Sequence, residues 1–194
     1  VVDRSDEWGM LTVLGAELTP GPRGALHVVR TAQGFDLIGP RADVAAASDE
    51  LVGEGSTLVG AAAYEAFRIE QGSPLQPFDI DDSTIPQEAE LELDAVSFTK
   101  GCFLGQELVC RIDSRGHVNR FLRRLVAIEG ERPAPGAEIV ADGKVVGVVT
   151  SVTPEPFAAV ALGYVRREVE PPTSVEVRSP NGLTTARVEP LRPV

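Results

Sequence analysis

The chain has 194 residues, and its 18 basic and 29 acidic side chains give a formal net charge of −11. Hydrophobic residues make up 43% of the sequence, which is typical of a folded protein and excludes wholesale disorder. No apolar run approaches the roughly 20 residues that a membrane-spanning helix needs. Because a chain this acidic repels phosphate groups, we expect neither direct nucleic-acid binding nor a membrane partner.

Cys102 and Cys110 are too few cysteines for a disulfide framework, and this usage favours a reducing, cytoplasmic setting. The sequence also lacks the pattern of a secretory signal. The spacing of the two cysteines and His117 matches no zinc motif, so we expect no resident metal. A predicted strand that starts almost at the first residue suggests a fragment of a longer parent chain.

The first forty residues predict β-structure. Strand-forming composition marks residues 10–14, 26–30 and 35–38, and Gln33-Gly34 is typical of a hairpin turn between the last two.

Two helices are expected to follow these strands. The first begins at Pro40 and ends at Gly53, and the second is capped by Ser56 and Thr57 and runs to about Gln71. Strands with helices packed on them imply an α+β layer.

Charge is unevenly distributed in the middle of the chain. Residues 69–96 contain eight acids and no base, and we interpret them as a long irregular connection whose acids are mostly solvated. The acids are Glu70, Asp79, Asp81, Asp82, Glu88, Glu90, Glu92 and Asp94. Between Lys100 and Arg124, six bases then outnumber two acids. These bases form either an anion-binding face or ion pairs with the acidic connection, and the sequence leaves both readings open.

The remainder of the chain predicts short strands separated by regular turns, which is typical of a small β-barrel. Asp142-Gly143 and Asn181-Gly182 are strong hairpin signals. The expected strands are 121–128, 144–152, 160–164, 174–177 and 185–188. We place the domain boundary near residue 117, which gives an α/β domain of residues 1–116 and a barrel domain of residues 117–194.

The segment from Thr99 to Glu107 places Cys102 between two glycines. A short helix is expected over residues 106–112, with Leu108 and Ile112 on one face, so that Cys102 lies at or just before its N-terminal end. The positive helix end and Lys100 would both favour the thiolate, which is the nucleophilic form of cysteine.

The alternative is that Cys102 is a small buried hydrophobe, which is the commonest fate of a free cysteine. The spacing alone favours this alternative, and it does so more strongly for Cys110, which would lie inside the helix.

Glu70 is a second candidate, because it falls in the last turn of its helix, where the helix dipole disfavours an anion. Either the carboxylate is kept there for a ligand, or Arg68 or solvent offsets the cost.

Two strings of residues resemble a known family. Lys100-Gly101-Cys102-Phe103-Leu104-Gly105-Gln106-Glu107, which ends at Arg111, closely resembles the signature of YgfZ-type folate-binding proteins. Arg68-Ile69-Glu70-Gln71-Gly72-Ser73-Pro74 resembles a string that this family shares with the glycine-cleavage T-protein, and the His117-Val118-Asn119-Arg120 segment also fits. The resemblance covers most of the chain.

The resemblance implies a fold and a function. It implies a ferredoxin-like α/β portion followed by a β-barrel around a folate channel, with tetrahydrofolate as the ligand. It implies a role in iron–sulfur cluster assembly or repair, in support of enzymes such as those of tRNA modification, with iron–sulfur proteins or their assembly machinery as partners.

The resemblance also implies roles for individual residues. Cys102 would be the functional cysteine, aided by Lys100, and Glu70 would hold the pterin ring through a bidentate pair. The implied ligand-binding residues further include Arg68 and Arg111, and the basic stretch would receive the glutamate tail of folate. The residues that shape or fix the loop are Gly101, Gly105, Gln106 and Glu107.

The sequence departs from the family in three ways. The family's N-terminal portion and half of the channel are missing, so the rest of the parent chain is an expected partner. The T-protein's catalytic aspartate lies in that missing region, and Cys110 stands where a small residue is usual. Two other functions are carried as alternatives: an aminomethyltransferase-like transfer of a one-carbon unit to tetrahydrofolate, and a non-catalytic interaction module.

Overall fold

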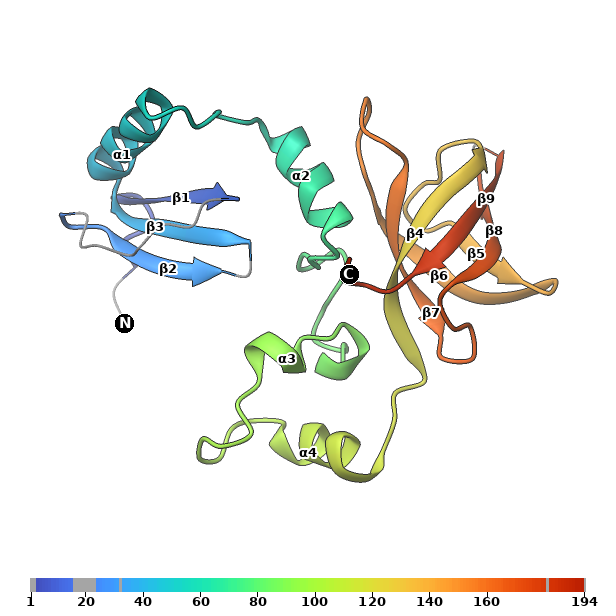
Figure 1. Cartoon of the computed structure of the whole chain (residues 1–194). Coiled ribbons are helices and arrows are strands. Elements are labelled where there is room, and N and C mark those ends of the chain that lie inside the picture. The colour runs from blue at the N-terminus through green and yellow to red at the C-terminus, as the bar shows by residue number, and fades with distance from the viewer. Residues whose placement is uncertain (1–2, 16–23, 32, 181, 194) are drawn as a thin grey trace. The chain divides into compact units, whose positions relative to one another are not determined.

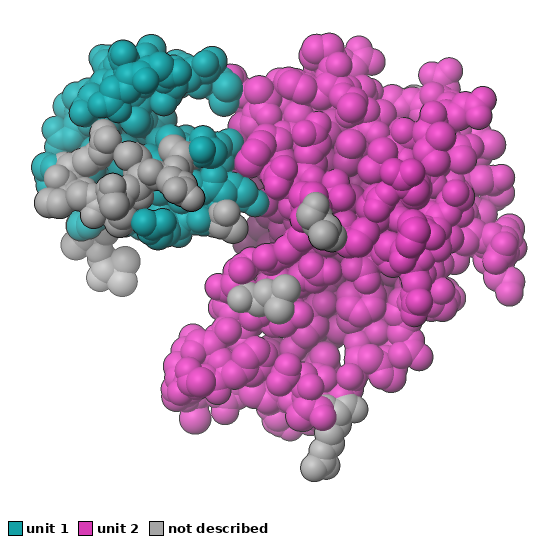
Figure 2. Space-filling model, in the orientation of Figure 1, with its two compact units in different colours: residues 1–59 teal, residues 60–194 magenta. Residues whose placement is uncertain are grey.

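The computed structural model describes residues 3–15, 24–31, 33–180 and 182–193. The chain divides into two compact units, residues 1–59 and residues 60–194, which Figure 2 colours separately. Each unit has its own hydrophobic core and is described by itself.

The first unit is a three-stranded antiparallel sheet with one helix. Its strands are β1 (Trp8–Leu14), β2 (His27–Thr31) and β3 (Gly34–Pro40), in the order β1-β3-β2. Thr31 pairs with Gly34, so the predicted hairpin is confirmed, although residue 32 within it lies outside the described residues.

Helix α1 (Arg41–Gly53) begins directly after Pro40, as the sequence predicts. Ala47 and Leu51 are buried on the sheet with Phe35 and Leu37, which makes the small core of this unit. The helix thus buries one apolar face against the sheet.

The second unit opens with α2 (Ala61–Glu70), and here the predicted start was wrong. Gly60, not Ser56 or Thr57, occupies the N-cap position with extended backbone, at φ −83° and ψ 170°. Leu58 is 72% exposed, so the residues before Gly60 bury no apolar face that would extend the helix.

The acidic connection folds into a short 3₁₀ helix, η1 (Pro86–Glu88), and the single-turn α3 (Glu92–Ala95). Its interpretation as a mostly solvated loop was wrong. Asp79 and Glu88 are buried, and of the eight acids only Asp81, Asp82 and Asp94 are exposed. The burial of these two carboxylates is tolerated because each is paired with an arginine.

Helix α4 (Gln106–Arg115) is longer than the predicted 106–112. Its buried residue is Val109, whereas Leu108, on the predicted face with Ile112, is 48% exposed. Both Cys102 and Cys110 are free and exposed, which contradicts the interpretation of either one as a buried hydrophobe.

The rest of the unit is a closed six-stranded antiparallel barrel, shown in yellow to red in Figure 1, and it confirms the predicted α+β class with a C-terminal barrel. The strands follow the order β4-β7-β6-β5-β8-β9 around the barrel. Their bounds are β4 (Arg120–Gly130), β5 (Glu138–Ala141), β6 (Lys144–Val152), β7 (Val160–Arg166), β8 (Thr173–Ser179) and β9 (Gly182–Glu189).

Both predicted barrel hairpins join neighbouring strands. Ala141 pairs with Lys144 across Asp142-Gly143, and Ser179 pairs with Gly182. Asn181 itself lies outside the described residues. Five of the six barrel strands were predicted from the sequence, and β5 was not.

Strand β7 is buried on both faces, and this feature organises the second unit. Ala161 and Val165 belong to the core of the barrel, while Leu162 and Tyr164 belong to a separate core with Ile69 of α2. Helix α2 packs on the outer side of β6 and β7. The end of α2 is therefore held in place by packing against the barrel wall.

The described helices include none long and apolar enough to cross a membrane. The barrel starts at Arg120, close to the predicted boundary near residue 117, but α2, η1 and α4 lie in the same compact unit as the barrel. The division into domains at residue 117 stays a prediction.

Candidate functional site

The C-terminal end of α2 carries two of the predicted site residues, Arg68 and Glu70. Arg68 is 4% exposed, and each of its five N–H donors is used within the protein. Nε donates to Glu65 over 2.7 Å, and Nη1 donates to Asp79 over 2.8 Å. The other acceptors are the Ser73 carbonyl, the second Glu65 oxygen and the Ser151 hydroxyl. Arg68 therefore has no donor left for a ligand, and its geometry is that of a structural anchor.

Asp79, which is 2% exposed, is the centre of this buried network. Its Oδ2 accepts from Arg68 and, over 3.0 Å, from the Leu75 N–H. Its Oδ1 accepts from the hydroxyls of Thr150 at 2.5 Å and Ser151 at 2.7 Å. The carboxylate thus joins α2, the connection after it and strand β6.

Burial by itself lowers the pKa of Arg68, because it penalises the charged guanidinium. The hydrogen bonds and charges of Glu65 and Asp79 outweigh burial and raise that pKa overall. Arg68 is therefore a permanent cation, and the carboxylates that surround it are what make its burial tolerable.

Glu70 differs from the other acids of this region. It is half-buried at the last position of α2, and its backbone carbonyl accepts from Arg124 Nη1 over 3.2 Å. Within the described residues, no side chain or backbone N–H donates to its carboxylate. A carboxylate on a fixed helix end, with its lone pairs free, suits a ligand that presents a pair of N–H donors.

The predicted thiol site is a loop that leads into α4. The Phe103 N–H donates to Gln106 Oε1 over 3.0 Å, which closes the loop, and Gly105 precedes the helix at φ +84°. The Lys100 ammonium lies 5.0 Å from the centroid of the Phe103 ring. Cys102 is exposed four residues before the helix begins. The loop therefore presents the thiol to solvent.

Glu107 and Arg111, two further residues of the motif, pair with each other on the surface of α4. Arg111 Nη2 donates to Glu107 Oε1 over 2.7 Å, but both side chains are largely exposed, at 67% and 87%. This is an ordinary surface pair one turn apart on a helix. Gln106, rather than Glu107 or Arg111, holds the loop.

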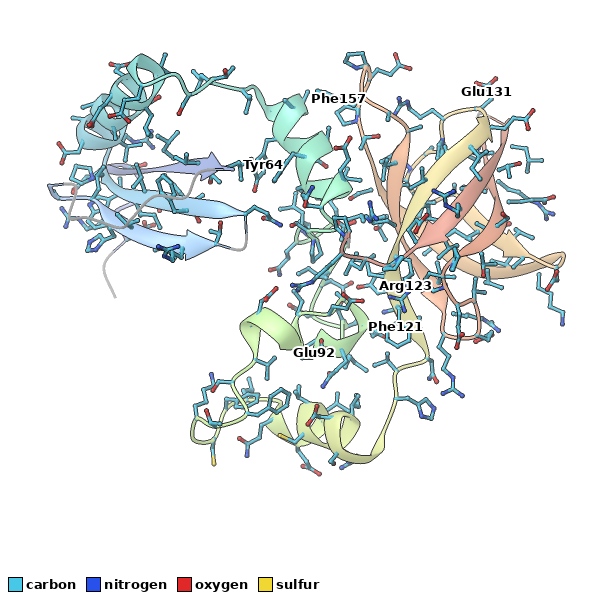
Figure 3. The ribbon with its side chains drawn as sticks, in the orientation of Figure 1. Tyr64, Glu92, Phe121, Arg123, Glu131 and Phe157 are labelled. Atoms are coloured by element: carbon cyan, nitrogen blue, oxygen red, sulfur yellow. The ribbon has the colours of Figure 1, made fainter. Side chains whose placement is uncertain are left out.

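Two bases of the basic stretch, Arg120 and Arg123, pair with the acidic connection. Arg120 donates twice to Glu88, each time over 3.0 Å, and Arg123 donates to Glu90 over 3.2 Å. Figure 3 labels Arg123 and Phe121 on β4, and the guanidinium of Arg123 lies 4.6 Å from the Phe121 ring. For these two bases the intramolecular reading is confirmed.

Arg124 of this stretch instead donates to two backbone carbonyls, those of Pro190 and Glu70. It lines a groove of about 410 Å³ at the edge of β4 and β9. Two other arginines of this groove are Arg187 and Arg192. Glu189 also lines the groove and pairs with Arg187, and Arg192 pairs with Asp94. Arg124 is therefore the arginine of this groove that has no carboxylate partner among the described residues.

Asp79 and Ser151 were not predicted as site residues from the sequence. Asp79 was counted among the solvated acids, although Phe78 and Ile80 on either side of it are apolar and signal a chain that returns to a core. No local pattern marks Ser151 as its partner, because the two residues are 72 positions apart. Among the described residues, no hydrogen bond or ion pair joins the Cys102 loop to α2, so the structure does not bring the two predicted sites together.

Comparisons with known proteins agree with the fold. Residues 123–194 match the family described as the glycine cleavage T-protein C-terminal barrel domain. An aminomethyltransferase from Rippkaea orientalis is 37% identical over 135 residues, which cover 66% of this chain and 36% of that protein. The tRNA-modifying protein YgfZ from Cronobacter sakazakii is 31% identical over 150 residues, which cover 74% of this chain and 45% of that protein.

Among solved structures, the glycine cleavage system aminomethyltransferase T from Bartonella henselae matches with a TM-score of 0.63 and 28% identity. The match covers 81% of this chain and 45% of that one. The chain is therefore a T-protein-like protein in its fold. More particularly, it is similar in sequence to YgfZ proteins and to aminomethyltransferases, which confirms the resemblance seen in its motifs. It spans less than half the length of each of these relatives.

Proposed function

We propose that this chain is the part of a YgfZ-like protein that binds folate and carries the functional thiol. The parent protein supports iron–sulfur cluster assembly or repair in the cytoplasm. The observation that carries the proposal is the Glu70 carboxylate, which is fixed on the barrel at the end of α2 and has no partner among the described residues. Tetrahydrofolate fits it, because the pterin ring offers adjacent amino and ring N–H donors to one carboxylate.

In this proposal the groove beside Arg124 receives the negatively charged tail of the folate. Arg187 and Arg192 of this groove pair with acids, so Arg124 is the cation that would bind a carboxylate of the tail. The remainder of the parent chain completes the folate channel.

Cys102 is the functional thiol in this proposal. It is exposed in a loop that Gln106 closes, so it is accessible to a partner protein. The expected partners are iron–sulfur proteins or the machinery that assembles them. The relative from Cronobacter sakazakii is called a tRNA-modifying protein, which agrees with a role behind an iron–sulfur enzyme of tRNA modification.

The test replaces Cys102 by Ser in the full-length parent gene and measures a tRNA methylthiolation activity that depends on an iron–sulfur enzyme. Cys110→Ser is the matched control, because Cys110 is also free and exposed, eight residues further along the chain. We expect Cys102→Ser to abolish most of the activity at normal protein abundance and Cys110→Ser to retain it. Equal activity in the two variants would overturn the role of the thiol.

A second candidate is aminomethyl transfer to tetrahydrofolate, which the 37% identity to an aminomethyltransferase favours. Cys102 in the Lys-Gly-Cys string argues against it, because T-proteins normally carry another residue there. Retained activity in Cys102→Ser, together with aminomethyl transfer by the full-length parent, would select this candidate.

A further inference from the structure

The last turn of α2 is attached to the barrel through three consecutive residues. The Arg68 side chain reaches Ser151 of β6 over 3.0 Å. Ile69 is fully buried in the core that it shares with β4 and β7, and the Glu70 carbonyl accepts from Arg124 of β4. The position of the helix end is therefore set by the barrel wall.

A β-bulge in β6 makes this attachment possible. The pairing of β6 with β7 shifts register between Val149 and Ser151, so Thr150 is the extra residue. Neighbouring side chains of a regular strand point to opposite faces, but a bulge changes the direction of one of them. The hydroxyls of Thr150 and Ser151 consequently both donate to Asp79 Oδ1.

Asp79 transmits this arrangement to α2 through Arg68. In addition to its side-chain bonds, its backbone carbonyl accepts from the Tyr164 hydroxyl over 2.9 Å, so Asp79 itself cannot shift. Successive residues of an α-helix are rotated by about 100°, which places Glu70 on a different face from Arg68. Because Asp79 fixes the side chain of Arg68, it fixes the rotation of the helix about its axis and hence the direction of the Glu70 carboxylate.

We propose that Asp79, acting through Arg68, is a positioning residue that aims the Glu70 carboxylate at its ligand. The inference rests on the proposed function for the identity of that ligand, tetrahydrofolate. It reassigns Arg68 from a ligand-binding residue to the link between Asp79 and α2.

The test is a double-mutant cycle on tetrahydrofolate binding by the full-length parent protein, measured by calorimetry. The variants are Asp79→Asn, Glu70→Gln and the two combined. In Asp79→Asn one carboxylate oxygen is replaced by an amide NH₂, which cannot accept a hydrogen bond. The link to Arg68 or to β6 is therefore lost. We expect Asp79→Asn to weaken binding at least about fivefold in the wild-type background and to have no further effect once Glu70 is Gln.

Glu88→Gln is the matched control. Glu88 is also a buried carboxylate paired with an arginine of the same unit, but its partner is Arg120, not a residue of α2. Equal weakening by Asp79→Asn and Glu88→Gln, or an equal effect of Asp79→Asn in both backgrounds, would show a merely structural role and overturn the proposal.

A second measurement separates this inference from the proposed function. The amides of Gln71, Gly72 and Ser73 donate to the carbonyls of the last turn of α2, and their hydrogen exchange reports its order without any ligand. We expect Asp79→Asn to accelerate their exchange about tenfold or more relative to Glu88→Gln. If the wild type binds no tetrahydrofolate, the proposed function fails, and unchanged exchange would overturn the positioning role whether or not folate binds. Ser151→Ala, which removes only the hydroxyl between Arg68 and Asp79, replaces Asp79→Asn in both measurements if that variant does not fold.

Discussion

Gly101 and Gly105 lie on either side of the exposed Cys102, and their backbone conformations differ. Gly105 adopts φ +84° directly before α4, a backbone conformation that L side chains rarely adopt. Gly101 has no positive φ, and nothing lies within 4 Å of the position that its Cβ would occupy. At the scale of single residues, one glycine of the motif is therefore required by the backbone and the other is not.

We predict that Gly105→Ala destabilises the second unit by about 1 kcal/mol, which is the usual cost of a side chain in the left-handed conformation. Gly101→Ala is the control and should change the free energy of unfolding by less than about 0.5 kcal/mol. Urea unfolding of both variants provides the comparison. An equal loss in both would mean that the backbone at Gly105 does not constrain the loop.

At the scale of elements, the end of α2 meets the last residues of the chain. Gly72 follows the helix at φ +69°, and a Cβ there would lie 1.9 Å from the Leu191 carbonyl oxygen. Leu191 belongs to the same core as Ile69 and Tyr164. The helix end that carries Glu70 is thus enclosed between the barrel wall and the segment after β9.

We predict that Gly72→Ala costs about 3 kcal/mol of stability, because it combines a left-handed backbone with a steric clash. Gly143→Ala isolates the first of these effects, since Gly143 also has a positive φ but has open space around its Cβ position. It should cost only about 1 kcal/mol. Thermal and urea unfolding should rank the two variants in this order, and the opposite order would mean that the close approach to Leu191 does not exist.

At the scale of the whole molecule, the second unit holds all the interactions that define the candidate site. The closed barrel leaves no open edge, and α2 and η1 cover the outer faces of Leu122, Leu162 and Tyr164. The charge pairs between the connection and β4 also lie within this unit. A domain boundary at residue 117 would divide this second core, in which Ile69 packs with Leu122 and Leu162.

We therefore predict that residues 60–194 fold when expressed alone and that residues 117–194 are less stable by at least about 3 kcal/mol, because the second core is then exposed to water. Amide NMR spectra and urea unfolding of the two fragments test this. Equal stability would instead support the domain boundary that the sequence suggests.

Sequence signals with a short range were the most reliable. Pro40 before α1, the Asp142-Gly143 turn and five of the barrel strands each depend on backbone preferences of a few neighbouring residues, and each was confirmed. The start of α2 was wrong because Ser56 and Thr57 are good caps in isolation, whereas the helix forms only where its apolar face is buried. The burial of Val109 rather than Leu108 in α4 likewise depends on what packs against the helix.

The sequence by itself determined the class of fold, the barrel, the two motifs and the resemblance that they carry. Only the tertiary structure decided which charged residues are structural and which are free. Arg68 and Asp79 are 11 positions apart and Asp79 and Ser151 are 72 apart, so no local pattern reveals that they share one buried network. The physical reason is that the cost of burying a charge depends on its spatial neighbours, and these are set by how the helix packs on the barrel.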